Sequence, residues 1–156
     1  MYNLKIKVMH SLQNNQIKDF IFGGKAIFTV LNKETKNRVT YKVQLPEFEK
    51  EANNPNPIYF VKVLNGTNND TNYMYIGKLL ANGTFSLTKG SKAGKDAPSV
   101  KGMEFISNRY LRSNNPHSSF EFYHEGHCAR CGRTLTVPES IESGFGPECI
   151  KLIHTK

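Results

Sequence analysis

The sequence predicts an α+β fold, in which an antiparallel β-sheet domain with one packing helix precedes a small module containing all three cysteines. Two observations predict the sheet: apolar and polar residues alternate in several short runs, and turn-forming residues separate these runs. A third observation, a C-x2-C pair followed by one more cysteine, sets the C-terminal residues apart. We expect a β-rich domain over residues 1–117 that ends in the helix, and a separate module over residues 118–156.

The first half of the chain is expected to form strands of a half-exposed sheet. Apolar residues alternate with lysines over residues 4–8, and β-branched and aromatic residues dominate residues 26–31. A polar, turn-prone segment at 32–37 and renewed alternation at 39–43 predict a hairpin. The acidic, Asn-rich stretch from Pro46 to Pro57 is expected to be a loop or a frayed edge.

Further strands and one helix are expected before residue 117. Residues 58–63, 73–80 and 84–87 favour strands, and Asn82-Gly83 is typical of a tight hairpin turn. Asp96 is expected to cap a helix whose first turn holds Pro98 and which runs to about Leu111. Its apolar stripe, which should cover one face of the sheet, consists of Val100, Met103, Ile106 and Tyr110.

The charge balance favours a polyanionic partner. The net charge is +8 at a pI of 9.4, and lysines and arginines that neutralise phosphates release condensed counterions. A Gly-rich loop at 89–95 places Lys92 and Lys95 where they can contact phosphates, although it lacks the spacing of a P-loop. No run of 18 apolar residues occurs, so we expect a cytoplasmic protein without a membrane partner.

The cysteines have the spacing of a structural zinc site. Cys128 and Cys131 form a C-x2-C knuckle, and Cys149 follows where Pro147 can begin a helix and favour a thiolate. Residues 134–137 can supply the short hairpin of a treble-clef or ribbon-like finger. Zinc takes four ligands of this type, and the sequence leaves the fourth open between His124 and His154, with His127 a third choice.

The run from Cys128 to Cys149, CARCGRTLTVPESIESGFGPEC, resembles an uncharacterised family found mostly in phages and other mobile elements. The resemblance extends over nearly the whole chain, including the segments at 23–30 and 96–99. It implies a phage-encoded protein acting in a bacterial host cell, supports the three cysteines as ligands, and slightly favours His124.

These observations predict a non-enzymatic, zinc-containing phage accessory protein that binds nucleic acid. The sequence contains no paired carboxylates and no nucleophile with its base, so neither catalysis nor a small-molecule substrate is expected. The alternative is a protein-protein inhibitor or adaptor acting on a host nucleoprotein complex of the CRISPR or restriction type. In either case the candidate contact residues are Arg130, Arg133, Lys151, Lys92 and Lys95.

Overall fold

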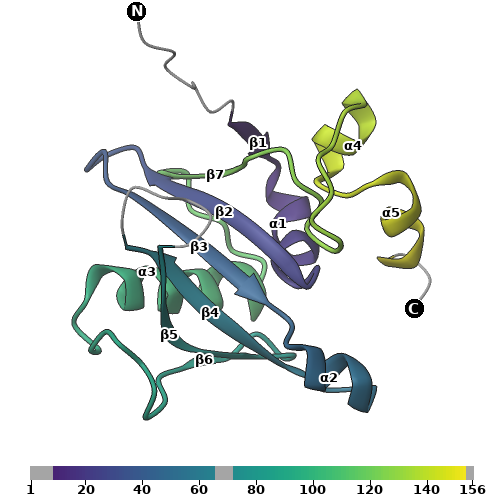
Figure 1. Ribbon diagram of the computed structural model, residues 1–156. Helices are drawn as coiled ribbons and strands as arrows, with labels where there is room; N and C mark the ends of the chain where they lie inside the picture. Colours follow the sequence, from purple (N-terminus) through teal and green to yellow (C-terminus); the bar gives the residue numbers. More distant parts are fainter. Residues whose placement is uncertain (1–8, 66–71, 154–156) are drawn as a thin grey trace, which may run out of the picture.

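A computed structural model describes residues 9–65 and 72–153, which form a seven-stranded antiparallel sheet with helices (Figure 1). The α+β class is confirmed, and the strand order is β1-β7-β2-β3-β4-β5-β6. The strand predicted at 4–8 lies outside the described residues. The strands are β1 (His10–Leu12), β2 (Lys25–Asn32), β3 (Arg38–Gln44), β4 (Ile58–Leu64), β5 (Tyr73–Leu80), β6 (Phe85–Ser86) and β7 (Phe120–His124).

The described residues contain more helix than the sequence predicted. The helices are α1 (Asn14–Ile21), α2 (Glu47–Ala52), α3 (Pro98–Ile106) with its π-helical extension η1 (Ser107–Leu111), α4 (Pro138–Ser143) and α5 (Pro147–Ile153). The prediction of a loop or frayed edge from Pro46 to Pro57 was wrong for Glu47–Ala52, where a short helix follows Pro46 with Glu47 and Glu49 in its first turn; residues 53–57 contain no helix or strand. No helix in the described part of the chain combines the length and apolar character needed to cross a membrane.

Helices α1 and α3 cover one face of the sheet and create the core. In Figure 1 both lie behind the strands. Ile17, Phe20 and Ile21 form a buried stripe at helical spacing on α1, and Met103 and Ile106 do the same on α3. The Tyr41 hydroxyl donates a hydrogen bond of 2.7 Å to the Ser99 carbonyl, which ties β3 to the start of α3.

The other face of the sheet points toward the viewer in Figure 1, and no described helix lies over it. Strand register assigns its side chains, which are partly exposed with the exception of Thr29, buried at the centre beside Thr40. We call this set the open sheet face. Its members on the longer strands are Lys25, Ile27, Thr29, Leu31, Arg38, Thr40, Lys42, Gln44, Ile58, Phe60, Lys62, Leu64, Tyr73, Tyr75, Lys78, Leu80, Glu121 and Tyr123.

Two local features set the register of β5 against its neighbours β6 and β4. The Asn82-Gly83 turn occurs as predicted, with Gly83 at a φ of +93° that suits glycine. A β-bulge then interrupts the β4–β5 pairing, because Val61 faces Gly77 whereas Lys62 faces Tyr75. Ile76 is the extra residue, and its side chain is buried.

The start of α3 differs by one residue from the sequence prediction. Ala97, not Asp96, occupies the N-cap position, and no side chain caps the helix. Pro98 is the first helical residue, since its fixed φ suits that position and it has no N–H to satisfy.

Strand β7 joins the C-terminal residues to the sheet. It lies between β1 and β2 and pairs antiparallel with both. The predicted boundary between residues 117 and 118 therefore falls just before a strand that is paired on both sides. Beyond β7, the chain adds to the same buried cluster as the sheet residues through Cys128, Ala129, Leu135, Phe145 and Cys149.

Gly23 offers a test of how tightly the C-terminal residues pack against the sheet. A Cβ atom at Gly23 would lie 2.6 Å from the Ala129 carbonyl oxygen, so Gly23→Ala must push two backbone segments apart. We expect a loss of about 1–3 kcal/mol in the free energy of unfolding, measured by urea denaturation. Gly94→Ala is the control, since nothing lies within 4 Å of its added Cβ; equal destabilisation of both variants would contradict the tight contact.

Candidate metal centre

Cys128 and Cys131 lie on a tight turn that follows β7. The Cys128 N–H donates to the Arg133 carbonyl at 2.8 Å, and the Gly132 N–H donates to the Cys128 carbonyl at 2.9 Å. Gly132 has a φ of +82°, a backbone conformation that residues other than glycine rarely adopt. We call this turn, residues 128–133, the knuckle. It brings the sulfur atoms of Cys128 and Cys131 within 4.8 Å of each other.

Cys149 reaches the knuckle from α5. Helix α5 begins at Pro147, as predicted, and Cys149 lies in its first turn with its side chain buried. The Ala129 N–H donates to the Gly144 carbonyl at 2.9 Å, which holds the α4–α5 connection against the knuckle. The hairpin expected at 134–137 is reduced to one β-bridge between His127 and Thr134.

The three thiols converge on one point. Their sulfur atoms all lie within 4.8 Å of one another, and no His, Asp or Glu among residues 9–65 and 72–153 joins the group. Cys128 and Cys149 are buried and Cys131 is exposed, so the centre lies at the surface of the molecule. Three thiol ligands at this separation form a group that can hold a metal ion.

Backbone N–H groups prepare Cys128 for the thiolate form. Burial by itself raises the pKa of Cys128, but N–H groups of Cys131, Gly146 and Arg130 favour the thiolate and bring its pKa down to about 7. The Arg130 and Cys131 N–H groups lie 3.4 Å and 3.5 Å from the sulfur. Cys128 is therefore the thiol that ionises readily near neutral pH.

Cys149 behaves differently from the prediction based on its helix position. Burial raises the pKa of Cys149, and the neighbouring thiols of Cys131 and Cys128 raise it further, although the Arg130 guanidinium opposes this. That guanidinium lies 3.7 Å from the Cys149 sulfur. A cation at the centre would reverse the balance by favouring all three thiolates together.

Both ring nitrogens of His124, one of the two predicted fourth ligands, bind the backbone in this structure. Its Nδ1 accepts a hydrogen bond of 3.1 Å from the Gly126 N–H, so Nε2 carries the proton and donates to the Ile141 carbonyl at 2.7 Å. The side chain is fully buried against the rings of Phe20 and His10. His124 thus fixes the path of the chain between β7 and α4, and this geometry leaves no nitrogen for a metal.

Of the other two candidate ligands, only His127 belongs to the described residues. His154 lies outside the described residues. His127 is exposed and its backbone pairs with Thr134, so its ring does not join the thiol group.

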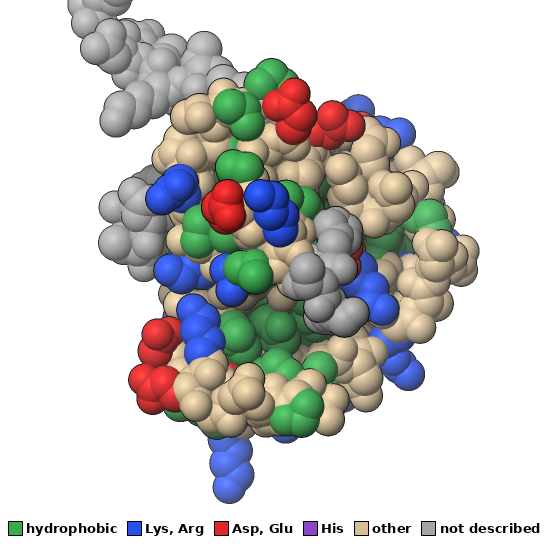
Figure 2. All heavy atoms as spheres, turned by 90° about the vertical axis from the view of Figure 1, so that its right-hand side faces the viewer, with side chains coloured by type: hydrophobic (Ala, Val, Ile, Leu, Met, Phe, Trp, Pro, Cys, Tyr) green, Lys and Arg blue, Asp and Glu red, His purple; other side chains and the backbone are tan. Residues whose placement is uncertain are grey.

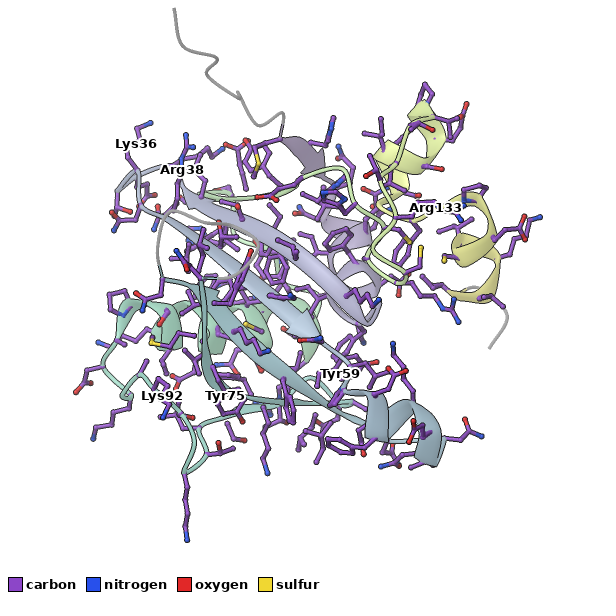
Figure 3. The ribbon with its side chains drawn as sticks, in the orientation of Figure 1. Lys36, Arg38, Tyr59, Tyr75, Lys92 and Arg133 are labelled. Atoms are coloured by element: carbon purple, nitrogen blue, oxygen red, sulfur yellow. The ribbon has the colours of Figure 1, made fainter. Side chains whose placement is uncertain are left out.

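The predicted contact residues fall into two groups at opposite ends of the molecule. Arg130 and Arg133 lie on the knuckle, and Lys151 lies on α5, where its ammonium pairs with Glu148 at 3.8 Å. Lys92 and Lys95 are exposed on the loop after β6, and the Lys92 N–H donates to the Tyr75 carbonyl at 2.9 Å. Figure 3 shows Lys92 beside Tyr75 at the lower left of the view, and Arg133 at the upper right.

The open sheet face connects these two groups, and sequence reasoning missed it. Five of its side chains are cationic, and Glu121 is its only acidic one among the described strand positions; the cations are Lys25, Arg38, Lys42, Lys62 and Lys78. The alternation of lysines with apolar residues was visible in the sequence, but which strands are neighbours was not. Register alone brings these charges onto one surface.

A basic cavity lies where the knuckle meets the sheet. It has a volume of 330 Å³, and its lining includes Lys25, Lys50, Arg130 and Cys131 together with the backbone of Gly23 and Gly24. Figure 2, which looks at the right-hand side of Figure 1, shows lysine and arginine side chains spread over this end, with apolar side chains in the hollow between them. Positively charged side chains therefore continue from the three thiols onto the sheet.

Comparison with known proteins places the C-terminal residues in context. Residues 119–154 match the model of a family described as a family of unknown function (DUF6011). The match covers β7, the knuckle and α5, and so includes every thiol of the centre. Searches of curated proteins and of solved structures find no match.

The thiol group predicts a metal-dependent fold. We expect about one divalent metal ion per chain by elemental analysis. Chelation or the Cys128→Ser substitution should lower the melting temperature, because the thiols would lose the metal ion that they bind together. Arg133→Gln, an exposed change in the same knuckle, should keep the metal. A metal-free protein whose melting temperature does not respond to chelator would contradict the centre.

We expect protonation of His124 to lower the free energy of unfolding in mild acid. Burial, the largest cause, lowers the pKa of His124 below its ordinary value of 6.5, and the hydrogen bond to Ile141 opposes this only partly. The unfolded chain therefore binds a proton before the folded chain does, so this contribution is complete above pH 6.5 and is lost as pH falls toward the folded pKa. Urea denaturation between pH 7.5 and about 5 should show this slope in wild type and in His127→Gln, but a smaller one in His124→Gln.

Proposed function

We propose that this protein is a non-enzymatic nucleic-acid-binding protein in which a structural zinc ion holds a basic knuckle against the end of the sheet. The match to a family of unknown function assigns no activity, so the proposal is argued from charge and geometry. The resemblance of the cysteine motif to phage and mobile-element proteins adds that this is a phage accessory protein.

The donor set supports zinc as the metal. Thiolates select soft or borderline ions, and zinc bonds of about 2.3 Å with tetrahedral angles separate two sulfurs by about 3.8 Å. The observed sulfurs lie within 4.8 Å of one another, so a small contraction of the knuckle toward α5 closes the site. Arg130 offsets part of the negative charge that three thiolates bring.

The observation that carries nucleic-acid binding is the charge of the open sheet face. Its five cations and single acid lie on a surface that no described helix covers. The face is also hollowed: Arg38 and Tyr123 line a depression of 240 Å³ with Met9, Thr29 and Leu31. A sheet face used only for solubility would carry both signs of charge, whereas a phosphate backbone requires one.

Two ion pairs lie away from this charge. Lys50 pairs with Glu47 on α2, and Lys151 pairs with Glu148 on α5. On the face itself, Lys62 contacts the neutral Gln44 side chain at 3.3 Å, and Lys42 lies over the Tyr73 ring at 5.4 Å. An amide and an aromatic ring position these two lysines and bring no negative charge of their own.

The measurement that tests this function is the salt dependence of oligonucleotide binding. We expect affinity to fall with salt, and Lys62→Gln/Lys78→Gln to reduce the slope of log K against log salt by about 0.7 for each phosphate of a single strand that is no longer neutralised. Lys101→Gln/Arg112→Gln removes the same charge away from the face, at exposed positions on and after α3–η1, and should leave the slope nearly unchanged. Equal slopes in both double variants, or no salt-sensitive binding to DNA or RNA, would exclude the open sheet face as a nucleic-acid-binding surface.

A further inference from the structure

Three aromatic side chains form a connected group at the α2 end of the open sheet face. Phe60 and Tyr75 belong to the face, with ring centres 5.6 Å apart and planes at 81°. Phe48 on α2 lies 6.1 Å from Phe60, and its side chain is 58% exposed. We call Phe48, Phe60 and Tyr75 the aromatic ladder.

The ladder contributes little to the core of the protein. The core lies on the opposite side of the sheet, where Phe28, Tyr41 and Phe122 are fully buried. Phe60 and Tyr75 are only half-buried, and Phe48 is the most exposed large apolar side chain among the described residues. Exposed rings placed side by side cost solubility, so their grouping indicates a contact surface.

The ladder is held in a fixed arrangement. The Tyr75 hydroxyl lies 3.0 Å from the Thr88 hydroxyl, and a Cβ at Gly90 would lie 3.5 Å from the Tyr75 ring. The residues after β6 therefore support one side of this ring. The near-perpendicular contact with Phe60 uses an edge of one ring, which leaves ring faces available to a flat ligand.

Lysines alternate with the rings across β4 and β5. Lys62 lies opposite Tyr75 in the register, and Lys78 lies opposite Phe60. Directly opposed residues in an antiparallel pair have Cβ atoms about 4.5–5.5 Å apart, so each ring has a cation next to it. Lys92, whose backbone binds the Tyr75 carbonyl, adds a third exposed cation at this edge.

From this arrangement we infer that the ladder is a stacking site for single-stranded nucleic acid, with bases on Phe60 and Tyr75 and phosphates at Lys62, Lys78 and Lys92. This inference rests on the proposed function and narrows its ligand. Stacking needs bases whose faces are accessible, and a duplex hides these faces between neighbouring pairs. Alternating rings and cations match a chain that itself alternates flat bases with phosphates.

Helix α2 sets one limit of the site. Glu47 and Glu51 are exposed on α2, on the same helix as Phe48, and their carboxylates repel a phosphate backbone. The strand is therefore expected to extend from Phe60 and Tyr75 toward Lys78 and Lys92 rather than along α2. Phe48 closes the ladder at this end.

The test compares ring-removing and ring-keeping variants by fluorescence anisotropy with labelled 12-nucleotide single strands and the matching duplex. Phe60→Leu and Tyr75→Leu keep apolar volume but lose the aromatic face, and each should bind the single strand about tenfold more weakly. Phe60→Tyr and Tyr75→Phe keep the ring and should bind like wild type. Phe105→Leu is the control, because Phe105 stacks on Phe120 at 4.5 Å and lines the hollow beside Tyr41 on the opposite side of the sheet.

The outcomes separate this inference from the proposed function. Wild-type-like binding by both leucine variants, with the salt slope retained, would overturn the stacking site and leave nucleic-acid binding intact. Preference for the duplex would do the same. Loss of binding in Phe105→Leu as well as in the leucine variants, with unchanged melting temperatures, would show that ring removal does not act at the ladder. A dimer in sedimentation that Phe60→Leu dissociates would assign the ladder to a second copy of the chain instead.

Discussion

The antiparallel pairing of β7 with β1 on one side and β2 on the other determines where the thiols lie. Because both edges of β7 are hydrogen-bonded, the residue that follows His124 must leave the sheet at a fixed point. A hydrogen bond of 2.6 Å from the Lys25 N–H to the Ala129 carbonyl holds the knuckle against the sheet. The close approach of the two backbone segments is possible because Gly23 has no side chain. A metal ion at the thiols would therefore stabilise the sheet as well as the C-terminal residues.

Two protonation balances, one of a histidine and one of the thiols, meet within this region. His124 is neutral and links the backbone of Gly126 to that of Ile141, whereas Cys128 is close to ionisation because N–H groups surround its sulfur. The stabilisation from the His124 hydrogen bonds requires a neutral ring, and metal binding requires thiolates, so both weaken as pH falls. Phe20 packs against His124 and Phe145, so α1 is in contact with this region as well.

Local sequence signals predicted the elements whose cause is local. Alternation identified the long strands, Asn82-Gly83 identified the turn, and Pro147 identified the start of α5 with Cys149 in its first turn. Helix α1 was missed although Ile17, Phe20 and Ile21 have helical spacing, because only eight residues carry the pattern. The open sheet face could not be predicted, since it depends on which strands pair and in which register. The hydrogen bonds of the His124 ring to Gly126 and Ile141 could not be predicted either, because tertiary structure sets these partners.

The bulge at Ile76 has a consequence for how odd and even positions of β5 are used. In a regular strand, Tyr75 and Lys78 would point to opposite sides, because they are an odd number of positions apart. The extra residue changes this parity, so a tyrosine and a lysine three positions apart share one surface while Ile76 and Leu79 both face the core. Because of this one additional residue, β5 contributes apolar side chains to the core on both sides of the bulge. On the opposite face, the same strand contributes the Tyr75 ring and the Lys78 charge.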